Sequence, residues 1–409
     1  MRGRTWIALA AFVVVAGIVA HRTATRLMVR PPQMPAQWTM CDFQGTLYYP
    51  AVAFLAGSNP YEPGFADAYP VERRLPAYGP LTVLLHLPLG LLPLPIAESV
   101  YFLLTLALVL VVAALTLRTC GLPSTPAWIF GLGTLMILSR PGHKNLLLGQ
   151  STMEVVLGIY LALIYTRDRP LVAALGLALT TMKPQFALPL VPLLLAARAY
   201  RVVAAGLASA AVLSLATLLP FGTAGILSWW QALVHSSTAA GQPSVMWFLR
   251  MDLGDALRVI FGAHGSLVDL AVATGTLALA AFTIHRVRLH DRPIAASALA
   301  LTATCTAVLV STYHLTYDAI LLTLPVVALL AGLDADILPG GTRIVLAALL
   351  LLPAVHYDLP TGRVVDALGL GPQWRIGFAV ANGVALSAAL VLSAFAVRQR
   401  RSDPRLRGA

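Results

Sequence analysis

One aspartate stands ahead of a helical stretch in a long polar segment. Asp42 precedes residues 47–56, whose pattern predicts an amphipathic helix on or in a membrane surface, ended by Gly57 and the turn at Asn59. A carboxylate in this place has two chemical uses: it can cap the helix N-terminus, or it can take a proton from a hydroxyl nucleophile. Spacing alone favours the cap, and the general base stays open as the alternative.

A second polar group follows a basic cluster at residues 140–145. Gln150 and Glu154 come after it and share one helix face, four residues apart. A carboxylate in an apolar helix costs about 2.5–3.5 kcal/mol at the centre of a membrane. We therefore expect Glu154 to face protein or a wet cavity. A salt bridge from Glu154 to Lys144 or Arg140 is the structural alternative.

The third candidate for chemistry is a lysine. Lys183 lies at a helix end that is broken by Pro184, and only two of the 28 basic residues of the chain are lysines. An ammonium group is a compact point charge that can neutralise a lipid phosphate. Its side chain can equally well extend to the headgroups and bind nothing specific.

A histidine and an aspartate form the fourth group. His314 and Asp318 are four residues apart, and Tyr313 and Tyr317 form the adjacent stripe. Such a pair can orient a proton carrier or bind sugar hydroxyls. A single structural hydrogen bond is the alternative, and the spacing does not decide between them.

The chain around these residues has the composition of a membrane protein. It is 409 residues long, 58% apolar and 11% charged, with a mean hydropathy of +0.80. Soluble domains carry about a quarter of their residues as charged side chains. The charges are scattered singly along apolar runs, which excludes a nucleic-acid-binding face. Cys41, Cys120 and Cys305 lie far apart, so neither a disulfide framework nor a zinc site is indicated.

A membrane span needs about twenty apolar residues. Charges, polar loops and Gly/Pro clusters cut the chain into about twelve candidate spans, several of them short. The first is interpreted as a retained anchor rather than a cleaved signal peptide, because no small-residue cleavage site follows it. The predicted spans cover residues 5–21, 96–117, 125–139, 150–166, 170–182, 184–197, 202–220, 266–285, 293–312, 315–332, 343–357 and 375–397.

The arginines orient these spans. With a cytoplasmic N-terminus, and with residues 81–93 dipping into the membrane without crossing, the cytoplasmic face has sixteen arginines and five acidic residues, which accounts for the whole net charge of +11. The long loops, at 22–95, 140–150, 221–265 and 358–374, then lie outside, and long loops of this kind are usually functional. No inverted pair of broken helices is visible, so a transporter architecture finds no support.

The predicted organisation is one all-α integral membrane domain, residues 1–397, followed by a basic cytoplasmic tail, residues 398–409. Its external loops 22–95 and 221–265 are expected to carry the active site. In the second of these, residues 226–233 predict an interfacial helix. Trp230 of this helix is expected in the aromatic belt of a membrane. Stacking on a sugar is the more specific alternative.

Together these pieces resemble the polytopic glycosyltransferases of family 87, which use polyprenyl-phosphate sugars and share a GT-C-type fold. The resemblance runs from Asp42 to about Gly332. Its most specific parts are Asp42-Phe43, Gly57-x-Asn59-Pro60-Tyr61, Tyr78-Gly79-Pro80-Leu81, Gly149-Gln150, Lys183-Pro184 and the segment from His314 to Asp318. It implies a GT-C-type membrane glycosyltransferase in the plasma membrane whose active site lies on the extracytoplasmic face.

The resemblance also implies roles for residues. Asp42 matches the aspartate of the first external loop that serves as catalytic base in the family. Lys183, with Arg140, His143 or Lys144, would then hold the departing phosphate. No Asp-x-Asp pair is present in the first external loop, so we expect transfer without a metal or other cofactor. The candidate substrate-binding residues are Tyr49, Asn59, Tyr61, Tyr78, Arg140, His143, Lys144, Gln150, Glu154, Lys183, Trp230, His314 and Asp318.

The expected reaction is inverting transfer of mannose from polyprenyl-phosphate-mannose to a glycolipid or lipoglycan acceptor. The arginine and alanine bias is compatible with the GC-rich genome of an actinobacterium. Transfer of arabinofuranose from the corresponding lipid donor is the near alternative. A flippase or transporter of a lipid-linked sugar is the alternative from another class, and it would not need a base at Asp42. A purely structural membrane scaffold fits least, because it would not need so many polar residues at one face of the bilayer.

Overall fold

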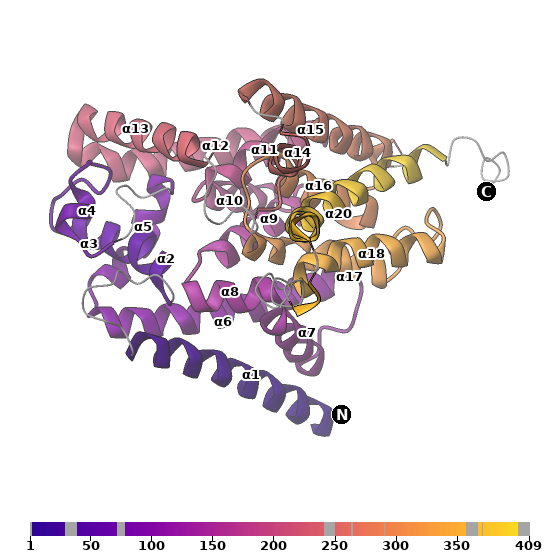
Figure 1. Ribbon diagram of the computed structural model, residues 1–409, viewed down its shortest axis with the longest axis horizontal. Coiled ribbons are helices and arrows are strands. Elements are labelled where there is room, and N and C mark those ends of the chain that lie inside the picture. Colours follow the sequence, from indigo (N-terminus) through magenta and orange to yellow (C-terminus); the bar gives the residue numbers. More distant parts are fainter. Residues whose placement is uncertain are drawn as a thin grey trace.

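The computed structural model describes residues 2–28, 39–71, 78–240, 250–262, 265–289, 291–356, 367–369 and 371–399. Helices account for most of this part of the chain, and an isolated β-bridge joins Arg250 to Leu315. In Figure 1, α1 lies along one side and α13 and α15 along the opposite side, with α8, α9 and α10 between them.

The long helices are α1 (Arg2–Met28), α6 (Leu94–Thr119), α12 (Tyr200–Leu218), α13 (Gly222–Ala240), α15 (Ser266–Arg288) and α20 (Pro372–Gln399). The helices of intermediate length are α5 (Pro80–Gly90), α7 (Pro126–Leu138), α8 (Arg140–Leu148), α9 (Thr152–Ile164), α10 (Pro170–Thr180), α11 (Pro184–Ala196), α14 (Leu253–Phe261), α16 (Ala298–Ser311), α17 (Thr323–Leu330) and α18 (Gly340–Val355). The remaining turns are α2 (Cys41–Phe43), the π-helix η1 (Gln44–Tyr48), α3 (Tyr49–Leu55), α4 (Phe65–Ala68), and the 3₁₀ helices η2 (Leu219–Phe221), η4 (Ile294–Ala296) and η5 (Thr316–Leu322).

Nine of the twelve predicted spans each fall on one helix. The other three, at 202–220, 293–312 and 315–332, each fall on an α-helix and an adjoining 3₁₀ helix. Proline at the first or second position marks the start of α5, α6, α7, α10 and α11, where its missing N–H costs nothing. Five stretches are long and apolar enough to cross a membrane: Gly3–Thr25, Leu94–Thr119, Tyr200–Val234, Ser266–Arg288 and Val380–Arg398. The chain is therefore an all-helical membrane protein, while the count of twelve crossings and the GT-C-type fold stay predictions.

The helix predicted at residues 47–56 begins earlier than expected. It starts at Cys41 and runs through α2, η1 and α3 to Leu55. Leu47 and Ala51 are fully buried where the helix packs against α5. Its placement on or in the membrane surface stays a prediction. Residues 81–93 form α5 and the turn after it, and this 11-residue helix is shorter than a span.

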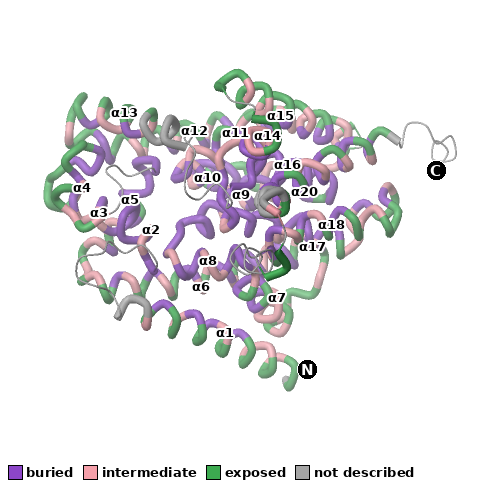
Figure 2. Tube along the Cα trace, viewed as in Figure 1, coloured by how far each residue is buried: buried purple, intermediate pink, exposed green. Residues whose placement is uncertain are grey.

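The core lies around the middle helices. Figure 2 shows buried residues gathered about α8, α9 and α10, while α1, α13 and α15 carry exposed residues on their outer sides. All residues of α16 are buried, whereas Trp6 and Ile7 of α1 are 68% and 72% exposed. Exposed apolar side chains of this kind are expected where a helix faces lipid. Of the predicted basic tail, residues 400–409 lie outside the described part of the chain.

Candidate functional site

Asp42 lies in the first turn of its helix and does not cap it. The N-cap is Met40, in the left-handed conformation with φ of 52°, and no side chain accepts a hydrogen bond there. The Met40 amide donates to the carbonyl of Leu147 at 2.8 Å, which ties the loop to the end of α8. The carboxylate of Asp42 is partly exposed and accepts a hydrogen bond from the side-chain amide of Gln150. The cap interpretation is therefore wrong, and the carboxylate is directed to another element.

A glycine makes this approach possible. Gly149 ends α8 in the left-handed conformation, with φ of 66°. A Cβ atom at this position would lie 2.5 Å from the Cβ of Phe43 and 3.1 Å from the sulfur of Met40. Only glycine combines this backbone conformation with so close a neighbour. Gly149 therefore sets Gln150 beside the turn that carries Asp42.

Gln150 connects the carboxylate of Asp42 to a buried cation. Its carbonyl oxygen accepts hydrogen bonds from the Lys183 ammonium at 2.7 Å and from the Tyr78 hydroxyl at 2.9 Å. Lys183 is 1% exposed, and its ammonium lies 5.1 Å from the ring centroid of Tyr78. The alternative in which Lys183 extends to the headgroups is therefore wrong, because the side chain turns inward.

A second glycine brings Tyr78 to Lys183. The Gly79 amide donates to the carbonyl of Met182 at 2.9 Å, and a Cβ atom on Gly79 would collide with the carbonyl oxygen of Thr181. The segment ahead of α5 thus runs directly against the residues that precede Lys183. The Tyr78-Gly79 and Lys183-Pro184 motifs, about a hundred residues apart, meet at this contact.

The network continues from Lys183 to His314. The Lys183 ammonium also donates to the hydroxyl of Thr152 at 2.8 Å, and that hydroxyl donates to Asp318 at 3.0 Å. The nearest oxygen of Asp318 is 3.7 Å from the ammonium nitrogen. The other oxygen of Asp318 lies 3.1 Å from Nδ1 of His314. The predicted pairing of His314 with Asp318 is thus a hydrogen bond, and polar contacts run without a break from Asp42 to His314.

The segment ahead of α14 supports the His314 end. The amide of Met251 donates to the carbonyl of His314 at 3.0 Å, and the guanidinium of Arg250 stacks 4.9 Å over the ring of Tyr313. Arg250 also holds Asp252 through two hydrogen bonds, of 2.9 and 3.0 Å. Burial alone would lower the pKa of Arg250, but the charges of Asp252 and Asp255 outweigh it and raise the pKa. Arg250 therefore stays charged and fixes the extended chain that carries His314.

Glu154 has its own partners, one turn away from Gln150. Its carboxylate accepts a hydrogen bond from the Tyr101 hydroxyl at 3.0 Å and lies 3.3 Å from Nε2 of His86. Glu154 therefore faces protein, as predicted, and the alternative of a salt bridge to Lys144 or Arg140 is wrong. Nδ1 of His86 lies 2.7 Å from the carbonyl of Thr82, so it carries a proton there. The contact between Nε2 and the carboxylate then requires one more proton, shared by His86 and Glu154.

Several other candidates surround the network. The Tyr61 hydroxyl donates to the carbonyl of Tyr78 at 3.1 Å, and the side chain of Asn59 accepts from the Tyr61 amide at 3.1 Å. These two hydrogen bonds connect the turn at Asn59 to the segment that carries Tyr78. Tyr49 packs its ring against Tyr69, with centroids 5.6 Å apart, and both rings are partly exposed.

The basic cluster and Trp230 are placed differently. Arg140 begins α8, roughly 12 Å along the helix axis from its last residue, Leu148, and it donates to the carbonyl of His356. His143 and Lys144 lie on the same helix and are partly exposed. Trp230 is 58% exposed, and its neighbour Trp229 packs inward instead. The structure thus joins neither Arg140 nor Trp230 to the described network.

Sequence reasoning missed three residues of the site. They are Thr152, between Lys183 and Asp318, and His86 and Tyr101, the partners of Glu154. Tyr317, which the sequence places beside His314 and Asp318, has its ring 5.2 Å from the Lys183 ammonium. Thr152 follows Gln150 by two residues, and His86 is a lone ionisable residue in an apolar run. Both signals were present in the sequence, whereas nothing local marks Tyr101.

The chain also matches the model of a known protein family. The model of glycosyltransferase family 87 matches residues 77–312, which is more than half of the chain. No curated protein sequence matches. The matched segment contains Tyr78, Gln150 and Lys183. Asp42 and His314 lie outside it at either end, and the hydrogen-bond network attaches both to residues inside it.

Proposed function

The chain belongs to glycosyltransferase family 87, and we propose that it transfers a mannosyl residue from polyprenyl-phosphate-mannose to a glycolipid acceptor, inverting the anomeric carbon. The proposal includes a multi-pass arrangement in the plasma membrane, with the active site on the extracytoplasmic face. The family supports glycosyl transfer. The donor, the acceptor and the roles of single residues are our proposal.

One observation carries the proposal: a carboxylate and an ammonium group bind the same side chain. The amide nitrogen of Gln150 donates to Asp42, and its carbonyl oxygen accepts from Lys183 at 2.7 Å. A transferase with a lipid-phosphate donor needs a base for the acceptor hydroxyl and a cation for the departing phosphate. The side-chain amide of Gln150 thus lies between the Asp42 carboxylate and the Lys183 ammonium and bonds both.

The exposure of Asp42 fits its proposed role as base. Asp42 is partly exposed, so an acceptor hydroxyl can reach its carboxylate. Lys183 is buried, and its two hydrogen bonds go to the neutral oxygens of Gln150 and Thr152. An ammonium has three N–H donors. The third can point to a phosphate oxygen, and in a site of low polarity that bond is stronger than in water.

The reaction then proceeds in one displacement. The acceptor oxygen attacks the anomeric carbon while Asp42 takes the hydroxyl proton, and the bond between that carbon and the phosphate oxygen breaks. Polyprenyl phosphate leaves with the bonding electrons, and Lys183 balances its added charge. Because a phosphate is already a good leaving group, a second carboxylic acid is not needed. The partly exposed rings of Tyr49 and Tyr69 offer a stacking surface for the acceptor sugar.

The test is a transfer assay with the purified chain in detergent, with EDTA present. Radiolabelled polyprenyl-phosphate-mannose and lipid acceptors are mixed with the wild type, with Asp42→Asn, and with Asp67→Asn. Asp67 is an exposed acid in α4 of the same loop and serves as the matched control. We expect transfer by the wild type and by Asp67→Asn, and a loss of about 10²–10⁴-fold in Asp42→Asn. Donor binding should persist in all three.

Other outcomes assign other functions. Full transfer by Asp42→Asn would remove that residue from the role of base. Transfer from the arabinose donor but not from the mannose donor would replace the proposed sugar. Donor binding without any product, together with donor movement across a liposome membrane, would replace the transferase by a flippase. Loss of transfer in EDTA that Mg²⁺ or Mn²⁺ restores would contradict the expected independence of metal.

A further inference from the structure

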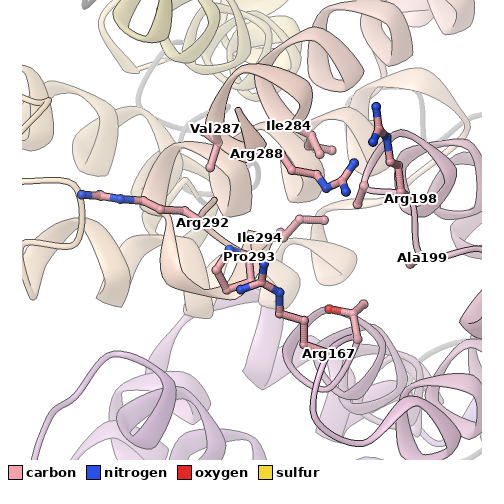
Figure 3. A pocket seen from close by; sticks show the side chains of 11 residues that line it. Arg167, Arg198, Ala199, Ile284, Val287, Arg288, Arg292, Pro293 and Ile294 are labelled. Carbon is pink, nitrogen blue, oxygen red and sulfur yellow. The ribbon is translucent and has the colours of Figure 1, made fainter. Parts of the chain in front are cut away.

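A cavity opens at the end of the bundle opposite to Gln150 and Lys183. Its volume is about 170 Å³, and its lining includes Thr166, Arg167, Arg198, Ile284, Arg288 and Ile294 (Figure 3). Helix α9 begins beside Gln150 and ends two residues before Thr166, and α11 begins after Lys183 and ends two residues before Arg198. Each helix has 13 residues, so the cavity lies roughly 20 Å from the proposed catalytic network.

Four arginines line this cavity, and two of them already have acidic partners. Arg167 pairs with Asp291 at 2.8 Å, and both side chains are largely exposed. Arg292 binds Asp334 at 2.9 Å and Asp336 at 2.7 Å. In Figure 3 the guanidinium group of Arg292 accordingly points away from the other three. Arg292 thus contributes its stem to the wall and little net charge.

The other two arginines are not neutralised in this way. Arg198 and Arg288 come from the α11–α12 connection and the end of α15, and both line the cavity. Arg198 is exposed and Arg288 is half-buried. Within the described part of the chain, neither forms an ion pair with an acidic side chain. Two guanidinium groups that share a cavity repel each other unless an anion lies between them.

The backbone conformation of Arg198 is a second observation that points to a functional position. Arg198 has a φ of 57°, the left-handed conformation that glycine and asparagine adopt most readily. The chain turns within the three residues 197–199, between α11 and α12. An arginine in such a turn costs backbone strain that a glycine would avoid, and strained residues concentrate at functional positions.

We propose that this cavity binds a phosphate group. Arginine matches a phosphate because its planar fork donates two parallel hydrogen bonds. One water needs roughly 10–15 Å³ of such space, so about 170 Å³ admits a phosphate with the atoms attached to it. The apolar wall formed by Ile284, Val287 and Ile294 suits the glycerol and first methylenes of a phospholipid better than a fully hydrated ion.

The positive-inside rule explains why arginines are frequent at one membrane face, but it requires only that positive charge lie near the bilayer. It does not require a cavity, a shared opening for two unpaired guanidinium groups, or a strained backbone at one of them. A basic pocket between helices is a recognised way of holding an anionic lipid headgroup. The cavity is remote from Asp42, so phosphate binding there can be tested independently of the proposed transferase reaction.

The test measures ligand retention by the full chain after delipidation in a neutral detergent. Phosphatidylglycerol, phosphatidylcholine with the same acyl chains, and inorganic phosphate are each titrated, and bound ligand is counted by native mass spectrometry. The variants are Arg198→Gln and Arg288→Gln. Arg118→Gln is the matched control, because Arg118 is an exposed arginine in the last turn of α6, outside the cavity lining.

We expect the wild type to bind phosphatidylglycerol in preference to phosphatidylcholine. Each cavity variant should bind it about tenfold more weakly, the loss of one charge-assisted contact, while Arg118→Gln is unchanged. If inorganic phosphate binds with the same dependence on Arg198 and Arg288 and the lipid does not, the site is confirmed and its ligand is a soluble phosphate. Equal weakening by all three variants, or no binding of either phosphate, overturns the proposal.

Arg198→Lys and Arg288→Lys cover the case in which a glutamine variant fails to fold. They keep the charge and the long stem but lose the fork, so we expect a weaker site with the same elution volume and melting temperature. Unchanged affinity in both lysine variants would show that general charge, and not a built phosphate site, attracts the lipid.

Discussion

The side-chain amide of Gln150 donates a hydrogen bond to the carboxylate of Asp42 across 108 residues of sequence. This contact joins a loop outside the family match to a helix start inside it. It orients one carboxylate oxygen of a side chain that is partly exposed. The position of the proposed base thus depends on the short backbone link that sets Gln150 in place.

Gly149→Ala should displace that base. The residue has a φ of 66°, and its new Cβ would lie 2.5 Å from the Cβ of Phe43, the neighbour of Asp42. The left-handed backbone alone costs about 1–2 kcal/mol. Because a misplacement of about 1 Å can cost a hundredfold in rate, we expect transfer to fall by one to two orders of magnitude.

Gly57→Ala is the control for Gly149→Ala. Gly57 has a similar φ, 76°, but an added Cβ would meet nothing within 4 Å. Melting temperatures and transfer rates of the two variants are compared in the same detergent. Both should lose the stability that a left-handed alanine costs, and Gly149→Ala should lose more because its Cβ also collides with Phe43. Only Gly149→Ala should lose transfer. Equal loss of transfer would show that strain alone, and not the placement of Asp42, is responsible.

The pair of Glu154 with His86 predicts a difference between two substitutions. Glu154→Gln keeps an acceptor for the Tyr101 hydroxyl and gains an N–H that can donate to Nε2 of His86. We expect its free energy of unfolding to change by less than about 1 kcal/mol. Glu154→Leu leaves two buried polar groups without a partner, at about 1–3 kcal/mol each.

Thermal unfolding of both variants checks this, and a transfer assay adds a second readout. The structure shows Glu154 held by protein groups, so Glu154→Gln should also retain most of its transfer activity. If Glu154→Gln folds as stably as the wild type but loses transfer, Glu154 contacts substrate as the sequence analysis expected. Equal destabilisation by glutamine and leucine would mean that the carboxylate charge itself is needed.

The sequence predicted the helices well because each depends on a local property. The predicted span 96–117 and the observed α6, Leu94–Thr119, differ by two residues at either end. The apolar run sets the length, and Pro95 and Arg118 mark its ends. The family resemblance, based on short motifs, is confirmed by the match to residues 77–312.

The contacts between helices could not be predicted in the same way. Nothing near Glu154 shows that its partner would be His86 rather than Lys144, because that choice depends on how α5 packs against α9. Asp42 was expected ahead of a helix and lies instead in its first turn, because the helix begins at Cys41. Whether it caps that helix depends on the backbone of Met40, which no spacing rule describes. Polar pairs across the bundle follow from the packing, and the packing is not local.

His314 gives a prediction about the far end of the network. Its Nδ1 lies 3.1 Å from Asp318, and the side chain is fully buried against the ring of Phe186, at 4.3 Å between centroids. His314→Phe keeps a ring of similar size but loses the hydrogen bond to a charged group, at about 1.5–3 kcal/mol. His314→Gln can still donate to Asp318 and should keep more of the stability. Equal melting temperatures for the two variants would show that the hydrogen bond contributes little.

The ion pair of Lys183 with Asp318 allows stability and catalysis to be separated. Both side chains are at most 2% exposed, and 3.7 Å lies between the ammonium nitrogen and the nearest carboxylate oxygen. Lys183→Met leaves the charge of Asp318 buried without its cation, which costs about 3–5 kcal/mol in comparable sites. The charge on Asp318 is still partly balanced by the hydrogen bonds from Thr152 and from the Leu315 amide, so we expect a loss near the lower end of that range.

Lys183→Met/Asp318→Asn removes both charges and should recover most of the lost stability, because no unpaired charge then remains. If Lys183 also holds the departing phosphate, transfer by the double variant stays as low as that by Lys183→Met, even though the protein is stable again. Melting temperatures and initial transfer rates of the wild type and the three variants, with Asp318→Asn as the third, complete the cycle. Recovery of both stability and transfer would make Lys183 a structural counter-ion and exclude it from phosphate binding. Recovery of stability alone would place its ammonium at the donor phosphate.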